Sequence, residues 1–197
     1  MYKKFCGTVG SGNNISLLAH MISRPETNFV FFVSEWRMKD VLNRMDMLLN
    51  SNNLLSGGNN IKIVELDLGS SVNDIIRKLK NYPGYDSIVI DGIGNLTLGD
   101  GSENDLSYLE IIGKIDEDLY NISQEEDGYE VIVTQQIQRN SYISDREDVL
   151  KKFKLSQLDE GREGVQYVLC TIGMQGEEGH LKSYNCDTEQ EMKFYIN

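Results

Sequence analysis

A glycine-rich stretch near the N-terminus has the residue types and the spacing to bind a phosphate group. Gly7 and Gly12 occupy the two glycine positions of the pattern G-x-x-x-x-G-K-[ST], whose backbone N–H groups cradle phosphate oxygens. The next two positions, which this pattern fills with a phosphate-binding lysine and a magnesium-binding hydroxyl, are Asn13 and Asn14. We therefore expect an anion cradle without its cation contacts. The candidate cofactor-binding residues are Gly7, Gly10, Ser11, Gly12, Asn13 and Asn14.

Other polar residues stand at the ends of apolar, strand-like runs. Glu35 follows the second such run, Asp91 closes the fourth, and Gln136 lies just past the fifth. In open α/β sheets, ligands bind at the carboxyl ends of the strands. Together with Gly7, these residues are therefore predicted to converge on one edge of a sheet, which is a stronger signal than any of them alone.

Apolar runs alternate with helical patterns along most of the chain. The pattern predicts strands over residues 2–6, 28–34, 61–66, 86–91, 129–134 and 165–172. It predicts helices over residues 15–23 and 36–49, a third that Ser70 would cap, and a fourth over 105–122. Two short strands within residues 180–196 would close the chain as a hairpin. This order favours an α/β fold with a mainly parallel twisted sheet, helices on both faces and a C-terminal antiparallel hairpin.

Composition narrows the class of protein. The 197 residues suit a single domain over 1–197, and no apolar run approaches the length needed to cross a bilayer. No signal-peptide pattern follows the first lysines, so a cytoplasmic location is expected. The net charge of −12 opposes tight nucleic-acid binding and is compatible with a basic protein partner. Cys6 and Cys170 lie in apolar runs and are expected to be buried, reduced thiols.

Several motifs, taken in order, resemble the RecA-like ATPase core, and most closely the C-terminal domain of DnaB-type replicative helicases. The matching stretches are Phe31-Phe32-Val33-Ser34-Glu35, Ser87-Ile88-Val89-Ile90-Asp91 with Gly92-Ile93-Gly94-Asn95-Leu96, and Val131-Ile132-Val133-Thr134-Gln135-Gln136-Ile137-Gln138-Arg139. The segment Leu155-Ser156-Gln157-Leu158-Asp159-Glu160-Gly161 and the closing hairpin also fit. The resemblance begins at the first core strand, so we expect no counterpart of the helicase's N-terminal domain in this sequence.

The resemblance implies a three-layer RecA-like P-loop fold and assigns roles to the strand-end residues. Glu35 would be the catalytic glutamate, Asp91 the magnesium-binding Walker B acid and Gln136 a sensor glutamine. The cofactor would be ATP or another nucleotide, with or without magnesium, or none. Simpler interpretations remain open: Glu35 as a helix-start acid, Asp91 as a strand-end turn former and Gln136 as a plain polar residue. For Asn13 and Asn14 the simpler interpretation is helix capping.

The departures from the family bear on catalysis. Besides the two asparagines, the closing hairpin carries Ser183-Tyr184-Asn185 where the family has basic residues that reach a neighbour's nucleotide, and it contains no arginine. An early loop lysine of the ParA/MinD type is also missing, because that position is Thr8. The phosphate lysine, the metal ligand and the arginine finger are thus all in doubt.

Three hypotheses follow. The first is a catalytically impaired DnaB/RecA-like protein that acts as an assembly or regulatory partner, pairing with RecA-type subunits or with another protein. A stand-alone core of this kind would fit a role in DNA replication and a phage or mobile-element origin. The second is an active or weakly active helicase- or recombinase-type ATPase that borrows a cation from a neighbouring subunit. The third is a ParA/MinD-like partitioning or localisation protein, against which the long fourth helix and the glutamine-rich strand end argue.

Overall fold

The computed structural model describes residues 1–7, 13–34, 38–51, 60–125, 128–136, 165–172, 178–184 and 189–195. Its strands form an eight-stranded sheet in the order β3-β2-β4-β5-β1-β6-β7-β8. The strands are β1 (Tyr2–Gly7), β2 (Phe29–Val33), β3 (Ile61–Glu65), β4 (Ser87–Asp91), β5 (Glu130–Gln136), β6 (Val165–Ile172), β7 (Glu178–Tyr184) and β8 (Glu189–Tyr195). Neighbours from β3 to β6 pair in parallel, and β7 pairs antiparallel with both β6 and β8. The predicted parallel sheet and closing hairpin are confirmed.

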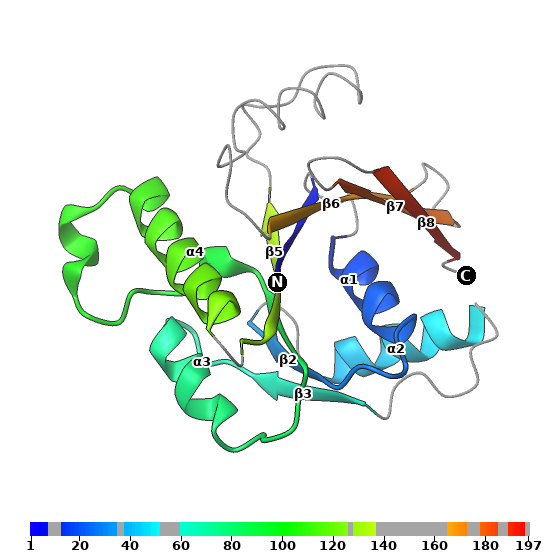
Figure 1. Ribbon diagram of the computed structural model, residues 1–197, viewed down its shortest axis with the longest axis horizontal. Coiled ribbons are helices and arrows are strands. Elements are labelled where there is room, and N and C mark those ends of the chain that lie inside the picture. Colours follow the sequence, from blue (N-terminus) through cyan, green and yellow to red (C-terminus); the bar gives the residue numbers. More distant parts are fainter. Residues whose placement is uncertain are drawn as a thin grey trace.

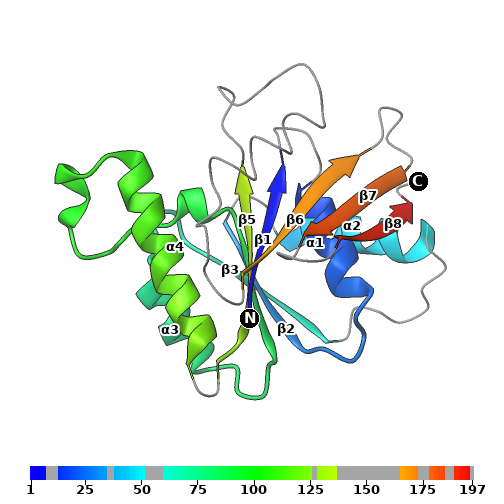
Figure 2. The same ribbon diagram turned by 45° about the horizontal axis from the view of Figure 1, so that its top comes forward.

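Helices cover both faces of the sheet. Figure 1 shows α1 (Asn13–Ile22) and α2 (Met38–Ser51) on one side, and α3 (Val72–Leu79) and α4 (Tyr108–Gln124) on the other. Two short 3₁₀ turns, η1 (Ile93–Asn95) and η2 (Ser102–Asp105), connect β4 to α4. In Figure 2 the arrowheads of β5, β1 and β6 point the same way, so the carboxyl ends of these strands share one edge. The three-layer α/β architecture agrees with the prediction.

Strand β2 shows why this sequence builds three layers. All five of its residues are buried, as expected for a strand between two helical layers. Phe29, Phe31 and Val33 pack in the core on the α1 and α2 side, whereas Val30 and Phe32 pack in the core on the α3 and α4 side. Since burial of one such side chain contributes about 1.5–3 kcal/mol, alternate residues of a single strand hold both helical layers.

Local capping signals set the starts of two helices. Ser71, and not the predicted Ser70, caps α3 through a capping box with Asp74. Ser70 instead donates a hydrogen bond from its hydroxyl to the carbonyl oxygen of Asp67. Ser107 caps α4 in the same way with Glu110, so this helix begins later than the sequence pattern predicted. In the described part of the chain, no helix combines the length and the apolar character that crossing a membrane requires.

The two lysines of β1 are pinned to opposite faces of the sheet. Lys3 Nζ lies 2.5 Å from Glu130 Oε1 at the start of β5. Lys4 Nζ lies 2.5 Å from Asp116 Oδ2 of α4. Both side chains therefore form ion pairs beside the sheet, with Glu130 and with Asp116.

Candidate functional site

The ends of three central strands are placed side by side by the register of the sheet. Gly7, the last residue of β1, pairs with Gln136, the last residue of β5. Strand β4 lies on the other side of β5 and ends at Asp91, which pairs in turn with Val33 of β2. The predicted convergence of Gly7, Asp91 and Gln136 on the carboxyl edge is confirmed for their backbones.

Asp91 is the centre of a polar network at this edge. Its side chain is fully buried, with 0% exposed area. Asn14 Nδ2, near the start of α1, donates a hydrogen bond to Asp91 Oδ2 at 3.2 Å. Thr134 Oγ1 donates to Asp91 Oδ1 at 3.1 Å. A residue of the loop helix and a residue of the intervening strand thus both contact the carboxylate that ends β4.

The backbone around Asp91 is held as firmly as its side chain. Ser34 Oγ, just after β2, donates to the carbonyl oxygen of Asp91 at 2.8 Å, and Asn95 Nδ2 donates to Ser34 Oγ at 3.2 Å. Gly92 has a positive φ of 76°, a left-handed conformation that favours glycine, and its N–H donates to Thr134 Oγ1 at 2.6 Å. The turn after β4 is therefore tied to both neighbouring strands.

The two asparagines at the loop's end belong to the helix. Helix α1 begins at Asn13, so Asn14 lies within its first turn. Asn14 is half-buried, and its amide points to Asp91 instead of capping its own helix. For Asn14, the capping interpretation is therefore replaced by a contact across the site.

Part of the predicted site lies outside the described residues, namely Gly10, Ser11, Gly12 and Glu35. Their assignments stay predictions, as do the roles of Gln136 as a sensor and of Gly7 as a cradle residue. Three residues that contact Asp91 or its neighbours were not predicted: Ser34, Asn95 and Thr134. The sequence held a signal for two of them, because Ser34 and Thr134 close the apolar runs of β2 and β5.

The contacts of Asp91 bear on whether magnesium fits. Mg²⁺ takes oxygen ligands in near-octahedral geometry and usually keeps several of its waters. The group that faces Asp91 from α1 is an amide nitrogen, where the P-loop pattern has a hydroxyl oxygen. In the described part of the chain, no three His, Cys, Asp or Glu side chains gather so that they could hold a metal ion. As arranged, the carboxylate of Asp91 meets an N–H of the Asn14 amide, which is not a ligand for magnesium.

Cys6 precedes the loop but offers no nucleophile. Its side chain is fully buried, and its Sγ lies 3.7 Å from the carbonyl oxygen of Lys4. Burial raises the pKa of the Cys6 thiol to about 12, against a smaller lowering effect of Lys4. Because only the thiolate is reactive, Cys6 is a buried, inert thiol, as the sequence predicted. The side chain of Cys170 lies outside the described part of the chain, so its burial stays a prediction.

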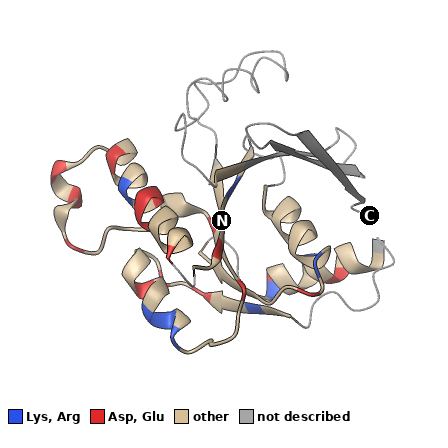
Figure 3. Cartoon of the chain, viewed as in Figure 1, with Lys and Arg blue, Asp and Glu red and all other residues tan. Residues whose placement is uncertain are grey.

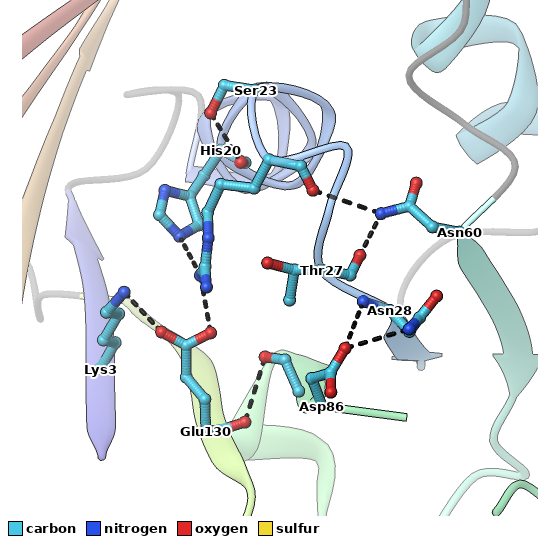
Figure 4. A network of polar contacts seen from close by, with 10 residues as sticks. Lys3, His20, Ser23, Thr27, Asn28, Asn60, Asp86 and Glu130 are labelled. Atoms are coloured by element: carbon cyan, nitrogen blue, oxygen red, sulfur yellow. Dashed lines mark hydrogen bonds and ion pairs between the residues drawn. The ribbon is translucent and has the colours of Figure 1, made fainter. Parts of the chain in front are cut away.

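A second polar network lies at the opposite edge, where the parallel strands begin (Figure 4). Glu130 Oε1 and Oε2 pair with Lys3 Nζ at 2.5 Å and Arg24 Nη1 at 2.6 Å. Asp86 Oδ2 accepts hydrogen bonds from the backbone N–H and the side chain of Asn28. These contacts tie the starts of β1, β2, β4 and β5 to the turn after α1, far along the strands from Asp91, so they hold the fold and not the site.

Charges in this second network shift two pKa values. Burial raises the pKa of Glu130, but hydrogen bonds and charge attraction from Lys3 and Arg24 outweigh it and bring the pKa to about 2. His20 packs against Phe5 with ring centroids 5.2 Å apart, and its Nε2 lies 3.4 Å from Arg24 Nη1. Burial, and then the charges of Lys3 and Arg24, lower the pKa of His20 to about 3. His20 is thus a neutral, packed histidine at neutral pH.

Comparison with solved structures identifies the fold. No protein-family model matches the chain, and no curated protein matches it. The chain superimposes on a solved ATPase domain with a TM-score of 0.73 and 16% identity, over 100% of this chain and 84% of that one. It also superimposes on a DnaB-like replicative helicase, from a structure described with its interactions with primase, with a TM-score of 0.68 and 16% identity. That match covers 98% of this chain and 55% of the helicase chain. The chain therefore has the RecA-like, DnaB-type ATPase fold.

Proposed function

We propose that this chain is a catalytically impaired DnaB/RecA-like P-loop protein that works as an assembly or regulatory partner in DNA replication. The observation that carries the proposal is the pairing of Asn14 with Asp91 at the head of α1. The position that should hold a metal-binding hydroxyl instead holds an amide, and the amide contacts the acid that should share the metal. Asn13, directly before it, stands where the P-loop pattern has its lysine.

The expected loss of catalysis is large. Phosphoryl transfer in this class depends on positioning and on neutralising charge, with little covalent chemistry from the protein. A charge-assisted hydrogen bond such as lysine to phosphate is worth about 1.5–3 kcal/mol, and an arginine finger roughly 10³–10⁵ in rate. A chain without the loop lysine and without an arginine in its closing hairpin should therefore hydrolyse ATP very slowly, even if its backbone cradle binds the nucleotide.

The surface charge supports a protein partner over bare nucleic acid. In Figure 3, acidic residues (red) occur along α4 and in the segment before it. Glu110, Glu117 and Asp118 of α4 are exposed, and Lys114 is the one exposed basic residue of that helix. Such a surface repels a phosphate backbone and attracts a basic protein face. One solved structure with this fold is that of a replicative helicase with its interactions with primase, which supports a replication protein as the partner.

Two measurements on the purified full chain test the proposal. Turnover of labelled ATP with magnesium should stay at the level of a no-protein blank, at concentrations where the chain is monomeric and where it self-associates. Magnesium-dependent turnover at both concentrations would falsify impaired catalysis, and turnover only in the oligomer would favour the ATPase that borrows a neighbour's cation.

Size-exclusion chromatography with a purified DnaB-type helicase, and separately with primase, should show co-elution that weakens with salt. Co-elution with neither would remove the replication partners from the proposal.

A further inference from the structure

In the contact between Asn14 and Asp91, the amide is the hydrogen-bond donor and the carboxylate is the acceptor. A carboxylate offers only hydrogen-bond acceptors, so the amide that faces it must present its NH₂ group. Asn14 Nδ2 lies 3.2 Å from Asp91 Oδ2, a hydrogen-bond distance, and joins residues 77 positions apart. The acid therefore meets a donor of partial positive charge at the point where the loop helix approaches it.

The second oxygen of Asp91 is also oriented. Thr134 Oγ1 accepts a hydrogen bond from the N–H of Gly92 at 2.6 Å and donates its own hydrogen to Asp91 Oδ1 at 3.1 Å. Thr134 is 4% exposed and Asp91 0% exposed, so this arrangement is shielded from water. Buried carboxylates need such partners, because a charge without them carries a large desolvation penalty. Both oxygens thus have donors supplied by the protein.

We propose that the Asn14 amide takes the place of a divalent cation on Asp91, so that the start of α1 stays joined to the end of β4 without magnesium. A cation at this point would join α1 to the end of β4 by attracting the carboxylate. The amide makes the same connection with a hydrogen bond to a charged group. This inference extends the proposed function and rests on it, because it assumes that this edge of the sheet derives from a nucleotide-binding site.

The test compares melting temperatures of the full chain in EDTA and in millimolar Mg²⁺ or Mn²⁺, with no nucleotide, at pH 8. The wild type should melt at the same temperature in all three buffers. Asn14→Ala should lower it in EDTA by roughly 3–10 °C, because a hydrogen bond to a buried charge is lost. A metal-dependent rise in the wild type, or an unchanged melting temperature for Asn14→Ala, would overturn the proposal.

A carboxylate in place of the amide gives the sharper readout. Asn14→Asp sets two like charges side by side, so it should melt below Asn14→Ala in EDTA and recover in Mn²⁺. Asn13→Asp is the matched control: it adds the same charge to the same helix end and should show no recovery in Mn²⁺. If Asn14→Asp proves as indifferent to Mn²⁺ as Asn13→Asp, the side chain does not face Asp91 and the proposal fails. The readout uses the isolated chain, so a failure to bind helicase or primase would leave this inference standing.

Discussion

Lys4 Nζ lies 2.5 Å from Asp116 Oδ2, and this ion pair joins the central strand β1 to the middle of α4. Lys4 is 5% exposed and Asp116 8% exposed. The hydroxyl of Tyr2 donates to the other oxygen of Asp116 at 2.6 Å. The strand that leads into the glycine-rich stretch is therefore anchored to a helix on the far side of the sheet from α1.

Removing one member of this pair should be costly. Asp116→Ala leaves the Lys4 ammonium buried without its partner, and breaking a buried pair in this way costs about 3–5 kcal/mol of unfolding free energy. Urea denaturation measures it. The exposed pair of Arg77 with Asp74 provides the control, because Arg77→Ala should cost less than about 1 kcal/mol. Equal losses from the two variants would contradict the role assigned to burial.

Glu130 should make stability fall in acid. Its pKa is about 2 in the folded chain against an ordinary value of 4.5, so the unfolded chain takes up the proton first. The stabilisation is fully present above about pH 4.5 and is lost as the pH falls through 2. Glu130→Gln should flatten the unfolding free energy over this window, whereas Glu26→Gln, at an exposed acid, should leave the curve as it is. Parallel curves for wild type and Glu130→Gln would rule the effect out.

His20 should act over a higher window. The folded pKa of about 3 lies below the ordinary 6.5, so between these values the unfolded chain binds a proton that the folded chain excludes. Unfolding free energy should therefore decline as the pH falls from 6.5 towards 3. In His20→Gln this decline should be absent between pH 6.5 and 4.5, before Glu130 begins to contribute. Melting temperatures recorded in steps across that interval distinguish the two residues.

Two glycines before α4 form a matched pair. Gly99 and Gly101 both have positive φ, 76° and 78°, so alanine at either should cost roughly 1–2 kcal/mol in strain. A Cβ on Gly99 would also lie 2.7 Å from Ser71 Cβ, whereas nothing lies within 4 Å of one on Gly101. Gly99→Ala should therefore destabilise the chain more than Gly101→Ala, by at least about 1 kcal/mol. Similar urea midpoints would show that the Ser71 cap can move aside.

Asn13→Lys should raise the affinity for nucleotide. A lysine at this position would restore a charged contact of about 1.5–3 kcal/mol, which corresponds to roughly a 10- to 100-fold lower dissociation constant for ADP. Isothermal titration calorimetry measures it, with Asn13→Gln as an uncharged control of similar length. No gain over the glutamine variant would indicate that the stretch from Gly7 to Asn13 does not form a phosphate cradle.

The architecture could be predicted well from the sequence, because a strand that is buried on both faces is an uninterrupted apolar run. The uninterrupted apolar run of β2 could only be a central strand, and Asp91 closing a similar run placed an acid at the carboxyl edge. Boundaries were predicted less well where capping decides them: Ser70 and Ser71 are both good caps, and only Asp74 three residues after Ser71 distinguishes them. The extension of β5 to Gln136 depends on pairing with β1, which local sequence does not reveal.

The contacts of the site could not be predicted in the same way. The types of Asn14 and Asp91 were noted from the sequence, but their hydrogen bond depends on how α1 is set against β4, 77 positions away. Thr134 was part of a matching stretch, yet its link to Asp91 follows from the alignment of Ile90 with Val133 between β4 and β5. Pairwise geometry of this kind comes from the packed sheet as a whole.

The position of β5 between β1 and β4 has a mechanical consequence. Gly7 and Asp91 end strands that do not pair with each other, and these two strands are separated by two inter-strand steps of about 4.8 Å each. Strand β5 lies between them, and backbone geometry fixes this spacing. From β5, the side chain of Thr134 reaches Asp91 on one side. If β5 shifted by one residue, the side chain of Thr134 would point to the opposite helical layer. The register of β5 therefore determines the side-chain contacts along this edge of the sheet.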